Sequence, residues 1–95
     1  MKEHSVLIVD DIPSIRTAIA DYLSFHFEVL QAADGKDAWE VCQNRQVDFL
    51  LTDIRMPQMG GLELIELYRK AFPGRPFALM TAYDINDYVR YAREL

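Results

Sequence analysis

The sequence predicts an α/β fold, a parallel β-sheet whose strands are joined by helices. Four mostly apolar runs cover residues 5–11, 27–34, 47–53 and 76–82, and stretches with helical spacing of apolar residues follow each of them. A strict strand–helix alternation favours a parallel sheet with right-handed crossover connections. In such sheets ligands bind beyond the carboxyl ends of the strands, so these ends are where functional residues are expected.

Three of the four strand segments are continuously apolar: SVLIVDD (5–11), VDFLLTD (47–53) and PFALMTA (76–82). Strands that carry no polar alternation are typical of parallel sheets covered on both faces. The segment FEVLQAAD (27–34) is more polar. We therefore expect it nearer an edge of the sheet.

Each helical stretch has apolar residues at spacings of three and four, which predicts one buried face per helix. Turn residues separate the elements at Asp34-Gly35 and Phe72-Pro73-Gly74, and Asp84 is placed to cap the last helix. The four faces consist of Ile15, Ala18, Ile19, Tyr22 and Leu23; Ala38, Val41 and Cys42; Leu64, Ile65, Tyr68 and Phe72; and Ile85, Tyr88, Val89 and Ala92.

Composition narrows the classes of function. The 95 residues make one domain, and the net charge of −5 argues against direct nucleic-acid binding while it suits a cation site. No apolar run approaches the roughly 20 residues of a membrane span, and the N-terminus lacks a signal-peptide pattern. The single cysteine, Cys42, cannot form an internal disulfide, so we expect a reducing, cytoplasmic setting and a buried Cys42.

Acidic residues end two of the predicted strands. Asp10 and Asp11 end the first and Asp53 ends the third, while Thr81 and Ala82 end the fourth. Carboxylates that converge repel one another unless a cation neutralises them, and Mg²⁺ is the hard cation that fits a few carboxylates and waters best. An ionised Asp beside Mg²⁺ can attack phosphorus and form an aspartyl phosphate, and a nearby Thr81 hydroxyl would bond the transferred group.

Four segments resemble the receiver domain of two-component response regulators, in that family's order and spacing. They are LIVDD (7–11), AADGKDAW (32–39), DIRMPQMGG (53–61) and LMTAY (79–83), and the resemblance extends over essentially the whole chain, as a single receiver domain over residues 1–95. The resemblance implies a flavodoxin-like (CheY-like), doubly wound parallel sheet with strand order 2-1-3-4.

The resemblance also implies a role for each matching residue in the phosphoryl chemistry. Asp53 would be the phosphoacceptor and Thr81 the switch hydroxyl, with the small Ala82 giving the phosphoryl group access. Asp11 would bind Mg²⁺ directly and Asp10 through water. The ion would also contact Asp53, and Mn²⁺ would substitute for it.

Further residues would hold or tune this site. The backbone carbonyl of Arg55 would complete the metal ligands, while Met56, Pro57 and Gly61 would shape the loop into the third helix. The side chains of Arg55 and Tyr83 would influence the lifetime of the phosphoryl group.

The implied function is a signalling switch. A sensor histidine kinase or phosphotransfer protein would phosphorylate Asp53, and the surface of the fourth strand and helix would then change and control an output domain or partner protein. The chain would catalyse only its own phosphoryl transfer and slow dephosphorylation.

The sequence departs from the family pattern at its C-terminus. The family's fifth strand, its fifth helix and the lysine that ends the fifth strand have no counterpart before Leu95. We expect an exposed fourth strand and poorly covered first and fourth helices. Three explanations stay open: a fragment of a longer receiver, a sheet completed by another chain through dimerisation or domain swapping, and a minimal module.

Two other classes of function also stay open. A Mg²⁺-dependent phosphatase with an Asp nucleophile would show an Asp-x-Asp pattern after the first strand, whereas this chain has Asp10-Asp11-Ile12-Pro13. A receiver-like interaction scaffold that never accepts a phosphoryl group is supported only by the missing lysine.

Overall fold

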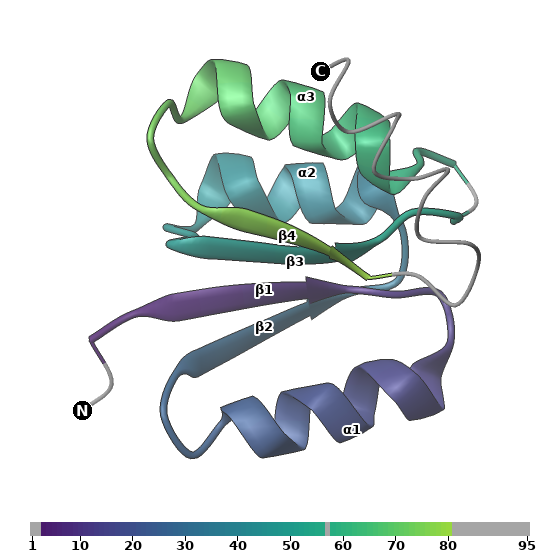
Figure 1. Cartoon of the computed structure of the whole chain (residues 1–95), viewed down its shortest axis with the longest axis vertical. Coiled ribbons are helices and arrows are strands. Elements are labelled where there is room, and N and C mark those ends of the chain that lie inside the picture. Colours follow the sequence, from purple (N-terminus) through teal and green to yellow (C-terminus); the bar gives the residue numbers. More distant parts are fainter. Residues whose placement is uncertain (1–2, 57, 81–95) are drawn as a thin grey trace.

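Four parallel strands form one sheet in the order β2-β1-β3-β4 (Figure 1). The computed structural model describes residues 3–56 and 58–80. The strands are β1 (Ser5–Val9), β2 (Glu28–Ala32), β3 (Phe49–Asp53) and β4 (Phe77–Met80). The predicted fold class and strand order are therefore confirmed, and β1 and β3 are neighbours, with Val6 aligned to Phe49 and Val9 to Thr52.

Helices cover both faces of this sheet. Helix α1 (Pro13–Leu23) lies on one face, and α2 (Gly35–Asn44) and α3 (Gly61–Ala71) lie together on the other (Figure 1). The helices in the described part of the chain are all too short and too polar to span a bilayer. The predicted fourth helix, with its cap Asp84, lies outside the described residues.

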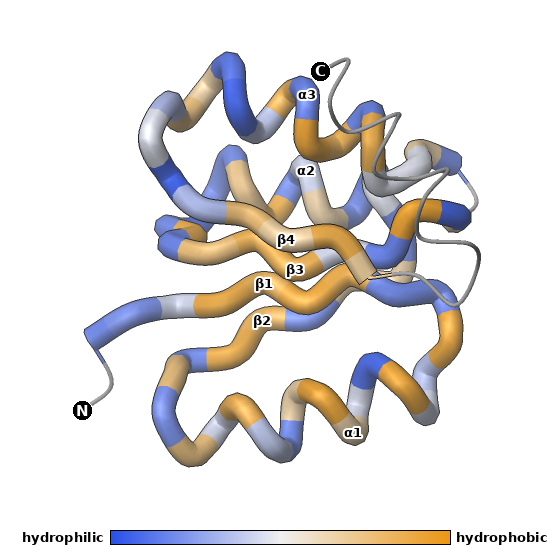
Figure 2. The backbone as a smooth tube through the Cα atoms, viewed as in Figure 1, coloured by the Kyte–Doolittle hydropathy of each residue, from blue (hydrophilic) through white to orange (hydrophobic). Residues whose placement is uncertain are grey.

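The larger of two hydrophobic clusters lies between the sheet and the pair α2 and α3, and β1 contributes to both clusters. Strand β1 is coloured hydrophobic along nearly its whole length (Figure 2), and all five of its residues are buried. Full burial of a Leu, Ile or Val side chain contributes about 1.5–3 kcal/mol, so this strand anchors the sheet. The larger cluster contains Leu7, Val9, Ala32, Ala38, Cys42, Val47, Leu50, Leu64, Ile65 and Tyr68.

Helix α1 leaves part of its apolar face exposed, in line with the expectation of a poorly covered first helix. Ala20 is buried, and Ile19 and Leu23 pack against the smaller cluster, but Ile15 is 44% and Tyr22 74% exposed. Helix α1 packs mainly on β1 and β2. Residues on its far side therefore find no cover among the described elements.

The first predicted strand is two residues too long, for a local reason. Asp10 leaves the strand geometry because its side-chain Oδ1 accepts the amide hydrogen of Ile12 at 2.8 Å, a short-range bond that turns the chain. Its own amide still donates to the carbonyl of Ala32, at 3.2 Å. Asp10 is therefore held at the strand end and not within the strand.

Candidate functional site

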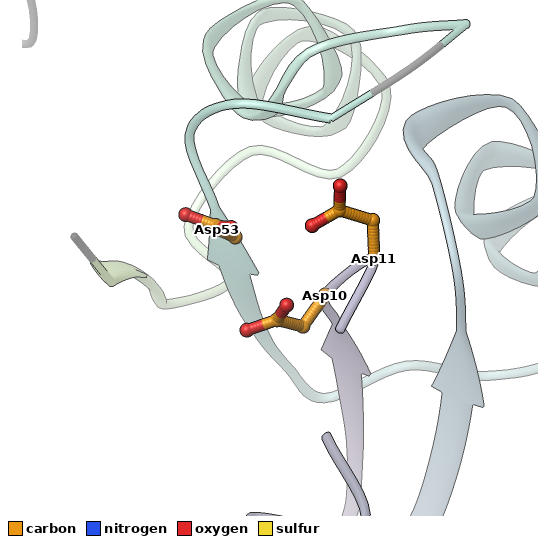
Figure 3. A group of neighbouring side chains, drawn as sticks. All are labelled: Asp10, Asp11 and Asp53. Carbon is orange, nitrogen blue, oxygen red and sulfur yellow. The ribbon is translucent and has the colours of Figure 1, made fainter. Parts of the chain in front are cut away.

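Three carboxylates converge at the carboxyl edge of the two central strands. Asp10 and Asp11 follow β1 and Asp53 ends β3, and one carboxylate oxygen from each lies within 4.8 Å of the others (Figure 3). The sheet order produces this cluster, because it makes the strands that carry the acids direct neighbours. The prediction that these acids meet is therefore correct.

Asp10 is the most rigidly held of the three acids. It is only 4% exposed, and its side chain is engaged by the amide of Ile12. Its backbone carbonyl accepts a hydrogen bond of 2.7 Å from Nη1 of Arg16, whose Nε donates to Oε1 of Gln31 at 3.2 Å. Arg16, which follows the acids by about one helical turn, thus braces the loop between β1 and α1.

Asp53 combines partial burial with neighbouring negative charge. Its Oδ1 accepts the amide hydrogen of Ile54 at 2.7 Å. Burial raises the pKa of the Asp53 carboxyl, and the charges of Asp10 and Asp11 raise this pKa further, while the amides of Ile54 and Arg55 oppose the increase. A cation placed among the three acids would relieve the repulsion and favour the ionised carboxylate.

The donor set fits a hard divalent cation. All the side-chain ligand atoms are carboxylate oxygens, the ligands that Mg²⁺, Ca²⁺ and Mn²⁺ prefer. Opposite ligands of Mg²⁺, each at about 2.1 Å, lie about 4.2 Å apart. Neighbouring ligands lie about 3.0 Å apart, so oxygens separated by up to 4.8 Å would have to move closer together, or one would have to act through a water, to hold Mg²⁺.

The loop after Asp53 returns to the strand end at the start of α3. The amide of Gly61 donates to the carbonyl of Ile54 at 2.9 Å. A Cβ at Gly61 would overlap the carbonyl oxygen of Asp53 and lie 2.9 Å from its carbon, so only glycine fits there. Met56 packs against the larger hydrophobic cluster. These contacts shape the loop that contains Arg55.

Some predicted site residues lie outside the described residues: Pro57, Thr81, Ala82 and Tyr83. Other contacts were missed in the sequence. The bond from Arg16 to the Asp10 carbonyl depends on how α1 turns after β1, which the sequence does not show. Gly35 was read only as part of a turn, although its amide donates to the carbonyl of Met59 at 3.0 Å.

Comparison with known proteins agrees with the fold. The family model described as "Response regulator receiver domain" matches residues 6–95. The chain is 34% identical to the response regulator protein PilR of Pseudomonas aeruginosa over 92% of this chain and 20% of that protein. It is 37% identical to a chemotaxis protein CheY homologue of Campylobacter jejuni, over 80% of this chain and 62% of the homologue.

Solved structures show the same similarity. The chemotaxis response regulator CheY4 of Vibrio cholerae superposes with a TM-score of 0.88 at 28% identity, over 98% of this chain and 80% of that one. A CheY-like receiver domain from Methanospirillum hungatei gives the same TM-score at 29% identity, over 96% of this chain and 74% of that one. Of the two relatives named above, the chain spans a fifth of the length of PilR and less than two thirds of the length of the CheY homologue.

Proposed function

Because the chain belongs to the response regulator receiver domain family of two-component signalling, we propose that it accepts a phosphoryl group on Asp53 from a sensor histidine kinase or phosphotransfer protein. The observation that carries the proposal is the convergence of Asp10, Asp11 and Asp53 within 4.8 Å at the carboxyl ends of the central strands. The receiver family typically works with Mg²⁺, which fits this donor set.

The proposed chemistry gives Asp53 a task different from that of Asp10 and Asp11. A carboxylate oxygen of Asp53 attacks phosphorus of a phosphohistidine, the new O–P bond replaces the P–N bond, and the released imidazole nitrogen takes a proton from solvent. Asp10 and Asp11, with the Arg55 carbonyl, would hold Mg²⁺. The bound ion would supply charge neutralisation and polarise the phosphoryl oxygens.

Phosphorylation would then act as a switch. The phosphoryl group carries about two negative charges in place of the single charge on the Asp53 carboxylate, and it brings three strong acceptor oxygens to a site that already repels negative charge. Thr81 is proposed to bond the phosphoryl group, which would change the surface of the fourth strand and helix and so control an output domain or partner protein. In the described sheet β4 is an edge strand, which is compatible with a dimer or a swapped sheet at this surface, one of the three explanations left open above.

This proposal treats the chain as a regulatory domain of the cytoplasm and not as a turnover enzyme. A phosphatase would release phosphate continuously from a phosphoester, and an interaction scaffold would ignore Asp53 altogether. No contact among the described residues favours either alternative, whereas the acidic cluster favours the phosphoacceptor.

The test is the intact mass of the protein after incubation with acetyl phosphate, with and without Mg²⁺. We expect one added phosphoryl group with Mg²⁺, and none with a chelator or in Asp53→Asn. Asp48→Asn is the matched control, because Asp48 lies at the opposite end of the sheet beside Ser5. It should still be phosphorylated. An unchanged mass of the folded wild-type chain with Mg²⁺ would refute the proposal.

A further inference from the structure

The first residue of α2 is in direct backbone contact with the loop that follows the candidate phosphoacceptor. Gly35 is buried, and its amide donates to the carbonyl of Met59 at 3.0 Å. The first amides of a helix have no partner within the helix, so this bond satisfies one of them with a residue far away in the sequence. It joins α2 to the segment between β3 and α3.

The contact leaves no room for a side chain at position 35. A Cβ at Gly35 would overlap the carbonyl oxygen of Met59 and lie 2.7 Å from its Cβ and 2.8 Å from its carbonyl carbon. Backbone atoms cannot rotate away as the end of a long side chain can. Any other residue at position 35 therefore has to displace Met59 or the start of α2.

The start of α2 is itself held in place by a helix cap and by burial in the larger hydrophobic cluster. Asp34 caps the helix, its Oδ1 accepting the amide hydrogen of Asp37 at 2.8 Å. Ala38, one turn into the helix, is fully buried in the larger hydrophobic cluster, and Trp39 packs against that cluster. A collision at Gly35 is therefore relieved more easily by movement of the loop than by movement of α2.

From these contacts we propose that Gly35 is a positioning residue for the candidate metal site. By admitting the backbone of Met59, it fixes the loop between Asp53 and Gly61, and with it the backbone carbonyl of Arg55 that would contact Mg²⁺. The inference rests on the proposed function. It adds a residue of α2, which carries none of the three acids, to the set that determines metal affinity.

The test compares Mg²⁺ binding by the wild-type chain, Gly35→Ala and Gly74→Ala, followed by the fluorescence of the single tryptophan, Trp39, and by titration calorimetry. Outer-shell changes typically weaken metal binding by about 10–100-fold, and we expect a loss of about tenfold in Gly35→Ala. Gly74 is the matched control because its φ of +89° makes alanine unfavourable there, yet no atom would contact the added Cβ. It should lose stability and keep its Mg²⁺ affinity within about twofold.

A second measurement needs no variant. Saturating Mg²⁺ should slow hydrogen exchange of the Gly35 amide in the wild-type chain, because ordering the loop also orders the bond to Met59 and linkage is reciprocal. If Gly35→Ala binds Mg²⁺ as the wild type does, or the Gly35 amide exchanges at an unchanged rate, the inference is overturned while the proposed function stands. A folded wild type that binds no Mg²⁺ overturns both.

Discussion

Replacing Asp53 by Asn should make the metal-free protein more stable. The substitution keeps the size of the side chain and the acceptor for the Ile54 amide, and it removes one of three charges that lie within 4.8 Å of one another. Two unit charges at that separation repel by about 0.9 kcal/mol at the dielectric constant of water and about 3.5 kcal/mol at an effective value of 20.

Two such repulsions are relieved, one with Asp10 and one with Asp11. Solvent screening of the exposed Asp11 favours the lower end of the range. We therefore expect a gain of about 1–2 kcal/mol in the free energy of unfolding and an increase of about 5–10 °C in the melting temperature. The assay is chemical and thermal denaturation followed by circular dichroism, in a chelator and at low ionic strength.

The dependence on pH has a definite sign. Because the pKa of Asp53 is raised in the folded protein, the folded state holds this proton more tightly than the unfolded chain. Protonated Asp53 therefore adds to the free energy of unfolding of the wild type. This added stability is fully present below the pKa of the unfolded chain and is lost as the pH rises through the pKa of the folded protein. The advantage of Asp53→Asn should appear over that same window and shrink with added salt or Mg²⁺.

Asp48→Asn is the control with the opposite sign. Hydrogen bonds from the Gln46 side chain and the Ser5 amide lower the pKa of Asp48. Its ionised form therefore stabilises the fold above the unfolded pKa, and this contribution is lost as the pH falls through the folded pKa. Asp48→Asn should be less stable than the wild type at neutral pH. An Asp53→Asn variant that is equally or less stable than the wild type without metal would refute the electrostatic reasoning.

Three further outcomes can be measured on the same protein. Tyr68→Phe should lower the free energy of unfolding by about 1 kcal/mol in urea denaturation, because the buried hydroxyl donates to the carbonyl of Val47 at 3.1 Å; an unchanged midpoint would contradict this. Gly61→Ala should lower the free energy of unfolding by more than about 2 kcal/mol, because the added Cβ would overlap the carbonyl oxygen of Asp53. A melting temperature like that of the wild type would show instead that the loop adapts. Burial raises the pKa of Cys42 to about 11. A thiol reagent at pH 8 should therefore label Cys42 only as fast as the chain unfolds. Rapid labelling of the folded protein would contradict this prediction.

The features readable from the sequence are those that depend on local pattern. Mostly apolar runs predicted the four strands. The strand-end positions of Asp10, Asp11 and Asp53 predicted that these acids converge, once β1 and β3 were taken as neighbours. Helical spacing of apolar residues, another local pattern, predicted that Cys42 and the apolar face of α3 are buried. A strand order, by contrast, came from the family resemblance, because periodicity does not say which strands pair.

What the sequence could not show depends on contacts between distant segments. The need for glycine at position 35 arises from the backbone of Met59, and nothing near Gly35 in the sequence indicates it. Poor cover of the first helix was expected, but which residues of its face are exposed, Ile15 and Tyr22 among them, depends on the elements that α1 meets. Helical spacing identifies an apolar face but does not reveal how much of that face a neighbour covers.

The central position of β1 has a consequence for how the chain assembles. Strand β1 is paired on both sides, with β2 and with β3, although β3 begins only at Phe49. At a synthesis rate of about 5–20 residues per second, β1 would remain unpaired on one side for several seconds, until β3 has been made. Pairings between distant segments also form slowly. The nascent N-terminal half should therefore be the part that chaperones recognise, and the three acids should come together only when β3 pairs with β1.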